Sequence, residues 1–301
     1  MKNSKVLTYI LISLSVVFWG ISFILTKELF LTEEHMTVTI LIAMRLAIAT
    51  LVMLPTLAIT RNLEPIKKGD LKWFLLLALC EPFIYHLCET SGVQLVSGSL
   101  ASVVIATIPL FVPFGMWVAY RKHISLQLIV GVVLSLGGVL VMLSGEFSTF
   151  NFQFSTLKGL LFLAGAVVIA VVYTLLLVKI VGHYRPLTIT TWQNLIGLIY
   201  FLPLVLAFDG SQLPLLSYSP KMLLILLTLG ICCSTLAYAF YNLGVRVLGA
   251  SEACIFNNAI PVFSLIAAIL IGQETFSWLK VLGIVIVIAG VILAQFEPKH
   301  R

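Results

Sequence analysis

Residues 92–143 read GVQLVSGSLASVVIATIPLFVPFGMWVAYRKHISLQLIVGVVLSLGGVLVML, and residues 244–295 read GVRVLGASEACIFNNAIPVFSLIAAILIGQETFSWLKVLGIVIVIAGVILAQ. Laid on each other with a constant shift of 152 and no gaps, the two stretches share 12 identities in 52 columns. Pro109 matches Pro261, and Gly138 matches Gly290. Proline and glycine have backbone roles that other residues rarely fill. The pattern therefore indicates an internal repeat.

The composition excludes a soluble enzyme. Of the 301 residues, 60% are hydrophobic and only 10% are charged, and the mean hydropathy is +1.13. Soluble domains carry about a quarter of their residues as charged groups. Here the charges lie between apolar runs of about twenty residues, which is the length of helix that crosses a bilayer core. The expected solvent for most side chains is therefore the lipid bilayer.

Apolar windows between polar breaks predict ten transmembrane helices, the first of which is the N-terminal run. The alternation of a membrane β-barrel is absent. Because backbone groups in lipid need partners inside their own segment, we expect an all-α polytopic membrane protein. The predicted helix cores are residues 7–29, 37–59, 71–91, 97–119, 125–144, 157–180, 187–207, 221–243, 251–272 and 277–296.

The basic residues predict the orientation of these helices. With the N-terminus inside, thirteen of the eighteen Lys and Arg residues fall in inner segments, four fall outside, and Arg45 lies within a span. This skew follows the positive-inside rule. The sequence therefore predicts that both termini face the cytoplasm.

The repeat and the helix count together predict the symmetry of the fold. Residues 1–145 would form the first five-helix repeat and residues 146–301 the second, within one integrated membrane domain. Because five is odd, the second repeat must cross the membrane in the opposite sense to the first. Inverted repeats of this kind are typical of secondary transporters, in which the two halves exchange shapes and give alternating access to a central site.

The sequence resembles the EamA-type ten-helix carriers of the drug/metabolite transporter (DMT) superfamily. FWGISFILTK at residues 18–27 is similar to the family's Trp-Gly start, and Arg45 falls where the family often has an arginine in its second helix. The last two helices are similar to the family's ending, with Pro-Val-Phe, a turn containing Gly272 and Glu274, and Ala-Gly-Val. In the first half YRKH stands where such a turn would occur.

This resemblance covers residues of about 9–143 and 157–295. It implies a multi-pass carrier of the bacterial inner (cytoplasmic) membrane that exports small amphipathic metabolites, such as amino acids or related compounds, or drugs. It implies nothing specific about the substrate. Uptake, or facilitated diffusion by the same fold, remains the alternative.

Charged side chains at membrane depth cost about 2.5–3.5 kcal/mol each, so each needs a partner, a cavity or a neutral state. Glu81, Tyr85 and Glu89 recur every four residues and share one helix face, and Arg45 lies at a compatible depth on the preceding helix. We hypothesise that this face borders a substrate cavity in which Glu81 or Glu89 meets a positive group or carries a coupling proton (H⁺). A static pair of Arg45 with one of these glutamates is the alternative.

Glu252 is the third candidate for proton coupling. It follows Gly249, Ala250 and Ser251 in the first turn of the ninth predicted helix. A carboxylate at that position also suits the helix dipole, so a structural role remains open.

Pro109 and Pro261 occupy equivalent places in the fourth and ninth predicted helices and are candidate hinges. Each proline leaves the carbonyl four residues earlier, at Ile105 and Asn257, without its helical donor. Asn257 is therefore a candidate substrate-binding residue. The alternative is an ordinary proline kink that neighbouring side chains satisfy.

Aromatic and amide residues complete the predicted cavity. We expect Trp19, Tyr173, Tyr238 and Asn242 to contribute to it, because rings with few fixed charges suit an amphipathic solute. Aromatic residues near span ends also serve as interfacial anchors, which is the alternative for this group.

Other classes of function find little support in the sequence. The five cysteines lie in apolar stretches without metal-ligand spacing, so we expect no metal site and no cofactor. Basic residues form no stripe that would bind nucleic acid. No Walker-type loop and no paired His or Ser-His arrangement appears, so neither ATP hydrolysis nor an intramembrane enzyme is expected. A channel would differ from a carrier by the absence of trans-stimulation.

Overall fold

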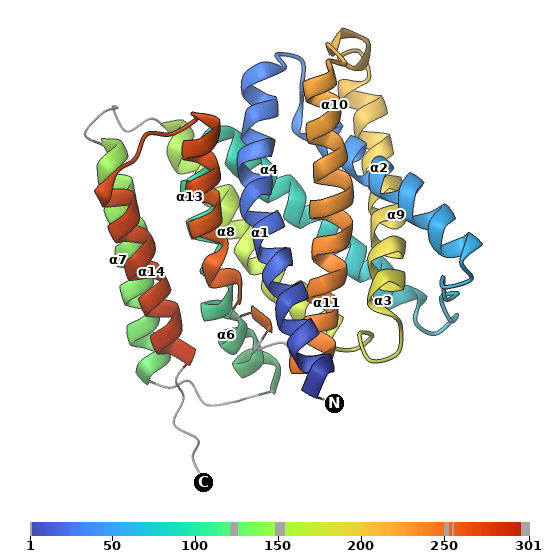
Figure 1. Ribbon diagram of the computed structural model, residues 1–301, viewed down its shortest axis with the longest axis horizontal. Helices are drawn as coiled ribbons and strands as arrows, with labels where there is room; N and C mark the ends of the chain where they lie inside the picture. The colour runs from blue at the N-terminus through green and yellow to red at the C-terminus, as the bar shows by residue number, and fades with distance from the viewer. Residues whose placement is uncertain (1, 121–125, 148–153, 250–252, 255, 296–301) are drawn as a thin grey trace.

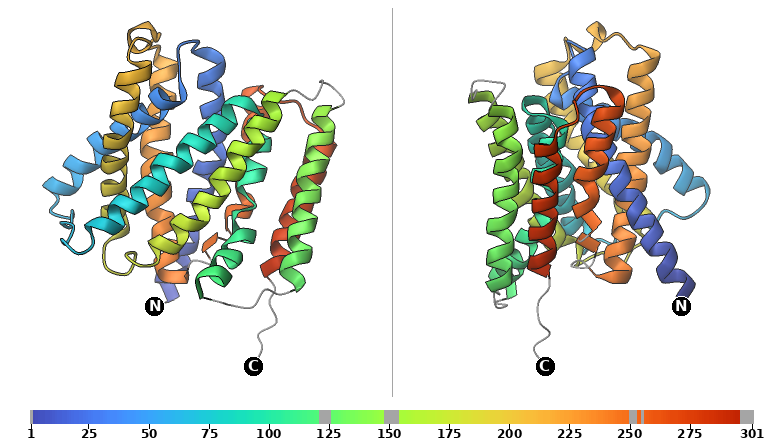
Figure 2. Two further views of the ribbon diagram at one scale, coloured as in Figure 1. Left: turned by 180° about the vertical axis from the view of Figure 1, so that it is seen from behind. Right: turned by 60° about the vertical axis from the view of Figure 1, so that its left-hand side comes forward.

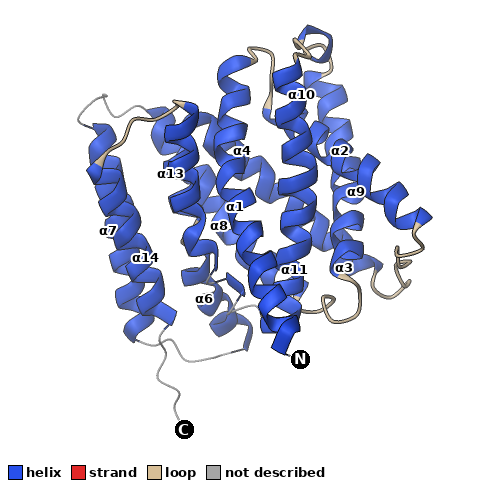
Figure 3. Ribbon diagram, in the orientation of Figure 1, coloured by secondary structure: helices blue, strands red, loops and turns tan. Residues whose placement is uncertain are grey.

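The computed structural model describes residues 2–120, 126–147, 154–249, 253–254 and 256–295. Within these residues every regular element is a helix, as Figure 3 shows. The helices stand side by side as one bundle, and the start of α1 and the end of α14 lie at the same end of it (Figures 1 and 2). The predicted all-α class is confirmed.

The elements of the first half follow the predicted cores. They are α1 (Lys2–Thr32), α2 (Val38–Ile59), α3 (Leu71–Ala78), the π-helical η1 (Leu79–Ile84), α4 (Tyr85–Leu95), α5 (Gly98–Ile105), α6 (Ile108–Tyr120) and α7 (Leu126–Phe147). Those of the second half are α8 (Phe154–Leu177), α9 (Pro186–Leu204), η2 (Val205–Asp209), η3 (Leu213–Leu215), α10 (Pro220–Leu227), the π-helical η4 (Thr228–Leu236), α11 (Ala237–Leu248), the 3₁₀ turn η5 (Phe256–Ala259), α13 (Ile260–Ile271) and α14 (Trp278–Gln295).

Seven helices of the described residues are long and apolar enough to cross a membrane. Three shorter apolar helices occupy the remaining predicted cores, at Ile129–Met142, Phe256–Ile271 and Trp278–Leu293. The chain is therefore a polytopic membrane protein by length and composition. The count of ten spans and the cytoplasmic placement of the termini stay predictions.

The distribution of side chains also fits a lipid solvent. Large apolar side chains cover the outside, with Ile59 82% exposed and Leu270 80% exposed. Polar and charged side chains lie inside, and Arg45 is only 2% exposed. In lipid an apolar exterior costs nothing, whereas a charge is tolerated only where it faces the bundle interior. The charged interior is therefore the place to look for function.

Local signals set several helix ends. The Ser97 hydroxyl accepts a hydrogen bond from the Leu100 amide at 3.4 Å, and the Ser219 hydroxyl accepts one from the Met222 amide at 3.2 Å. Such N-caps satisfy amides that have no partner in the first turn. Gly272 ends α13 with a φ of +81°, in the left-handed region that glycine adopts without strain.

Several predicted spans are interrupted in the structure, among them the third and the fourth. In the third span, Glu81 has extended backbone angles (φ −144°, ψ 121°) between α3 and α4, and the Glu81–Pro82 peptide is cis. In the fourth span, α5 ends at Ile105 and α6 begins at Ile108, so residues 97–119 form two helices. The sequence did not predict the first break.

The two candidate hinge prolines lie at helix starts. Pro109 is the second residue of α6, and Pro261 is the second residue of α13. A missing N–H costs little there, because first-turn amides have no helical acceptor. Each proline therefore begins a new helix instead of kinking a continuous one. The hinge role stays a prediction.

Helices α7 and α14 form a closely packed antiparallel pair at one edge of the bundle (Figures 1 and 2). A Cβ added at Gly138 would lie 2.8 Å from the Gly283 carbonyl oxygen, and one added at Gly290 would lie 2.7 Å from the Gly131 carbonyl oxygen. Only glycine permits such backbone approach. Gly131 corresponds to Gly283 in the repeat, and Gly138 corresponds to Gly290, so the contacts are reciprocal.

The same pair contains a direct bond between equivalent positions. The Ser135 hydroxyl donates to the Val287 carbonyl at 3.1 Å, and these residues are 152 apart, which is the shift of the sequence repeat. Equivalent helices of the two halves therefore meet face to face.

Candidate functional site

A cavity with an empty volume of about 600 Å³ lies in the centre of the bundle. Its walls come from both halves of the chain and include the broken third span and the start of α13. It is lined by Trp19, Ser22, Phe23, Arg45, Glu81, Tyr85, His86, Glu89, Ile105, Ile108, Ala170, Tyr173, Thr174, Tyr238, Tyr241, Asn257 and Ile260.

Most residues that the sequence nominated lie in this one cavity. Trp19, Arg45, Glu81, Tyr85, Glu89, Tyr173, Tyr238 and Asn257 all line it. Asn242 does not, because its fully buried side chain packs on α9, where its Nδ2 donates to the Thr190 hydroxyl at 3.2 Å. Pro109 and Pro261 are not lining residues, although each follows one. Glu252 lies outside the described residues.

Arg45 is held by a hydroxyl rather than by a carboxylate. Its Nε donates to the Ser234 hydroxyl on η4 at 2.9 Å. No ion pair joins Arg45 to Glu81 or Glu89, all three of which the structure describes. The guanidinium thus remains a positive charge that borders the cavity, and the arrangement differs from a static Arg–Glu lock.

Glu81 is fixed by two neighbouring helices. The Tyr238 hydroxyl on α11 donates to its Oε1, and the Gln193 Nε2 on α9 donates to its main-chain carbonyl at 3.0 Å. The carbonyl is free to accept because the helix is broken at this residue. Gly197 allows α9 to approach, since an added Cβ there would lie 2.9 Å from Pro82 Cδ.

Glu89 faces a histidine on its own helix. The His86 Nδ1 lies 3.4 Å from Glu89 Oε2, and the Thr90 hydroxyl donates to the same oxygen at 3.4 Å. His86 lines the cavity and is 3% exposed, whereas its place beside this face in the sequence favours a hydrogen-bonded interior residue over a proton relay. Its spacing of three residues before Glu89 was the available signal, because residues three apart are neighbours on a helix.

Aromatic rings also line the cavity. The Trp19 ring packs on Tyr238 with centroids 5.0 Å apart and on Tyr241 with centroids 5.2 Å apart. Tyr241, which the sequence groups with Tyr238 and Asn242, also lines the cavity. The Trp19 Nε1 and the Asn257 Oδ1 are buried and have no hydrogen-bond partner. Buried polar atoms normally have partners, so this donor and this acceptor are available to a ligand.

The cavity therefore offers two carboxylates, one guanidinium, a stack of rings and unpaired polar atoms. Such a surface suits a small solute that carries both a polar or charged end and an apolar body. It contains no group of three or more His, Cys, Asp or Glu that could hold a metal ion among the described residues.

Polar contacts close the bundle on the side where α1 and α13 end. The Lys27 Nζ on α1 donates to the Gln94 carbonyl at 2.9 Å and to the Val93 carbonyl at 3.2 Å, at the end of α4. The Gln273 Nε2, just after α13, donates to the Ile24 carbonyl at 3.1 Å and to Glu28 Oε2 at 2.6 Å. These bonds join α1 to both halves of the bundle, about one to two helical turns beyond the cavity residues Ser22 and Phe23.

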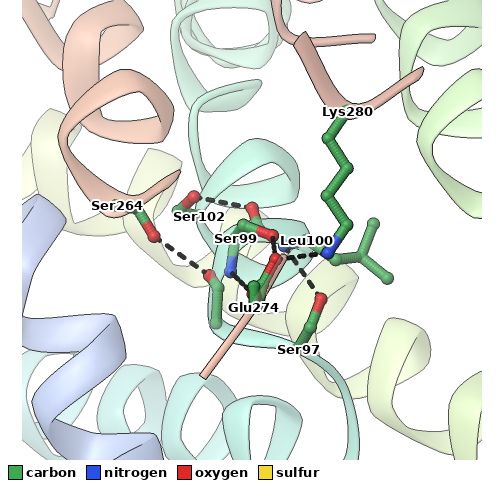
Figure 4. Close-up of polar contacts among 8 residues, drawn as sticks. Ser97, Ser99, Leu100, Ser102, Ser264, Glu274 and Lys280 are labelled. Carbon is green, nitrogen blue, oxygen red and sulfur yellow. Dashed lines mark hydrogen bonds and ion pairs between the residues drawn. The ribbon is translucent and has the colours of Figure 1, made fainter. Parts of the chain in front are cut away.

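Glu274 extends this closure to α5, as Figure 4 shows. Its carboxylate accepts from the Ser99 amide at 3.2 Å and from the Ser99 hydroxyl at 2.6 Å, and it pairs with Lys280. The loop between α13 and α14 is thus tied to the start of α5. We call the contacts of Lys27, Gln273 and Glu274 the polar closure.

If the polar closure holds the cavity shut on this side, Lys27→Met should loosen it. We expect a thiol reagent that does not cross the membrane to label a Ser22→Cys variant from the closure side about tenfold faster when Lys27→Met is also present. A tenfold change in the population of the open state corresponds to about 1.4 kcal/mol. Lys221→Met is the control, because Lys221 is exposed and pairs with Glu28 at 2.5 Å without touching α4. Equal labelling rates in both variants would show that Lys27 does not hold the closure.

Helices that are apolar outside and charged within, around a central cavity, define a polytopic membrane protein with an internal polar site. The sequence model of the EamA-like transporter family matches residues 6–144 and again residues 157–296. The chain belongs to the EamA-like transporter family, as the sequence resemblance implied.

Two relatives that are named as transporters match the chain over most of their length. The chain is 26% identical over 276 residues to the uncharacterized transporter YetK of Bacillus subtilis, covering 90% of this chain and 82% of that protein. It is 25% identical over 288 residues to an uncharacterized transporter of Archaeoglobus fulgidus, covering 95% of this chain and 97% of that protein. A solved crystal structure that is 18% identical shares the fold with a TM-score of 0.70, over 97% of this chain and 98% of that chain.

Proposed function

We propose that this transporter is a secondary active exporter that moves a small amphipathic metabolite across the cytoplasmic membrane by alternating access. The observation that carries the proposal is the central cavity, which combines Arg45, Glu81 and Glu89 with the ring wall of Trp19. An amino acid or a related zwitterion, or an amphipathic drug, fits that chemistry. The carboxylates would meet its positive group, Arg45 its negative group, and the rings its apolar body.

Alternating access is supported by three features of the bundle. The family model matches each half of the chain, equivalent glycines of the two halves contact reciprocally in α7 and α14, and both halves line the cavity. The polar closure covers one side of the cavity with hydrogen bonds that a second conformation could break and remake. Two similar halves that exchange shapes would open the site to one side at a time.

Comparison of the extracellular metabolites of cells with and without the protein tests export and nominates the substrate. We expect one compound or one chemical class to accumulate outside only when the protein is present. The purified protein in vesicles should then exchange labelled for unlabelled compound, with trans-stimulation by substrate on the far side. Continuous conductance without trans-stimulation would indicate a channel, and depletion of the outside pool would indicate uptake.

A proton is the proposed coupling ion, and Glu81 is its proposed carrier. In vesicles, Glu81→Gln should reduce transport driven by a pH gradient by at least about tenfold, a barrier change of about 1.4 kcal/mol. Substrate exchange at equal pH should fall less than pH-driven transport does, because glutamine keeps the shape and the acceptor for Tyr238, and Glu89 still offers a carboxylate, but glutamine cannot release a proton. The carboxylate of Glu89 is tested by Glu89→Gln and that of Glu252 by Glu252→Gln. Unchanged pH-driven flux in all three variants would exclude a carboxylate proton carrier.

A further inference from the structure

A second, smaller pocket lies behind Glu81. It has an empty volume of about 210 Å³. Its lining residues are Glu81, Pro82, His86, Thr190, Gln193, Asn194 and Tyr238. Glu81, His86 and Tyr238 also line the central cavity, so Glu81 stands in the wall between the two spaces. We call the smaller one the α9 pocket.

The α9 pocket exists because a polar helix face meets a broken helix. Thr190, Gln193, Asn194 and Gly197 follow the i, i+3, i+4, i+7 spacing that places residues on one face of a helix. Gly197 lets this face approach Pro82, and Gln193 takes up the carbonyl that the break at Glu81 releases. The break thus turns Glu81 toward a polar helix as well as toward the cavity.

The polar side chains continue from Glu81 toward the start of α9. Asn194 Nδ2 donates to the Ser234 carbonyl at 3.3 Å, and Thr190 accepts from Asn242 at 3.2 Å. The Asn242 Oδ1 is buried without a partner. Thr190 lies four residues into α9, which places it about 6 Å from the start of that helix along its axis. The start of α9 is at the end of the bundle that the basic residues predict to be cytoplasmic.

Such a pocket suits water rather than substrate. A small polar space with several donors and acceptors holds ordered water, whereas an apolar one stays dry. The ionisable groups around Glu81 are Cys80 beside it, Arg45 on α2, Tyr85, His86 and Glu89 on α4, Tyr173 on α8, and Tyr238 and Tyr241 on α11. All but Cys80 line the central cavity, and His86 and Tyr238 also line the α9 pocket. The face that α9 presents carries only hydroxyl and amide groups, which relay protons through water without holding a charge.

We propose that Glu81 exchanges its proton with the cytoplasmic side through water in the α9 pocket, by a route separate from the substrate cavity. The carboxyl O–H bond breaks, the proton passes to a pocket water to give hydronium, and the carboxylate remains; the reverse step reloads it. The proposal rests on the proton coupling proposed above. Its consequence is that a bound substrate does not block the exchange of the proton.

Infrared spectroscopy of the protein in lipid vesicles tests this route without a known substrate. The protonated carboxyl band of Glu81, assigned by its loss in Glu81→Gln, shifts when D₂O replaces H₂O. Thr190→Val and Asn194→Leu should each slow that shift by at least about tenfold. A tenfold slower rate corresponds to a barrier to proton exchange that is higher by about 1.4 kcal/mol. Thr191→Val is the matched control, because Thr191 is equally buried on the same helix, bonds to the Leu187 carbonyl at 2.8 Å and does not line the pocket.

A block of the central cavity separates the two routes. A bulky thiol reagent on Ser22→Cys, a cavity residue outside the α9 pocket, should leave the exchange rate within about a factor of two, less than 0.5 kcal/mol of barrier. Slow exchange after this block, or fast exchange in both pocket variants, would overturn the proposal. The absence of a protonated Glu81 band would overturn it as well. The proposed role of Glu81 as proton carrier fails in the separate transport experiment, if Glu81→Gln keeps its pH-driven transport.

Discussion

Arg45→Glu is expected to abolish transport, and a second change, Glu89→Arg, is expected not to restore it. The single change places a third carboxylate beside Glu81 and Glu89 and leaves the Ser234 hydroxyl without its donor. A buried charge without a partner at membrane depth costs about 2.5–3.5 kcal/mol, so flux should fall about 100-fold. The rate of substrate exchange in vesicles, normalised to the amount of monodisperse protein, measures this effect.

The double variant separates a binding role from a structural one. A static Arg–Glu lock would be rebuilt with its charges reversed, and exchange would return. In the structure Arg45 bonds to Ser234 on η4, and Glu89 lies beside His86. Each reversed charge would therefore face a neighbour that suits the original charge, and the two would not pair with each other. Arg61→Glu is the control, because Arg61 is exposed beyond the end of α2. Recovery of exchange in the double variant would contradict the proposed role of Arg45 in the cavity.

Gly138→Val is expected to separate α7 from α14, whereas Gly137→Val should be tolerated. The added Cβ at position 138 would lie 2.8 Å from the Gly283 carbonyl oxygen and 2.9 Å from the Val287 amide nitrogen, both main-chain atoms that cannot move alone. An added Cβ at Gly137 would meet nothing within 4 Å. Overpacking of this kind costs about 1–3 kcal/mol or more.

Thermal stability in detergent, followed by fluorescence-detected size exclusion, measures the difference. The melting temperature of the Gly138 variant should fall by several degrees or the protein should aggregate, while that of the Gly137 variant should match the parent. The two positions differ by one residue and receive the same side chain, so helix propensity cannot explain a difference. Equal melting temperatures would mean that the two helices pack less closely than described.

Hydropathy predicted most of the helices, because a helix that crosses the bilayer core needs about twenty apolar residues, and runs of that length are visible in the sequence. The break at Glu81 was not predictable in this way. Pro82 marks a weak point, but the extended backbone at Glu81 is stabilised by Gln193 and by the close approach at Gly197, both more than a hundred residues away. Contacts of that kind leave no periodic signal in the sequence.

The site was predictable where it follows helix geometry. Glu81, Tyr85 and Glu89 share the cavity, as their spacing indicated, although Glu81 lies at a break. Asn242 packs on α9 and does not line the cavity, and spacing alone cannot tell which polar face of α11 meets the cavity and which meets α9. His86 lies beside the same face in the sequence, and its spacing of three residues before Glu89 is the signal for the contact that the structure shows.

The reciprocal glycine contacts of α7 and α14 have the geometry of an interface between two copies of one subunit. Residue i touching j′ while j touches i′ is the signature of a two-fold interface between identical subunits. One chain therefore carries, at the contact of these two helices, the self-complementary kind of surface that otherwise joins two identical subunits.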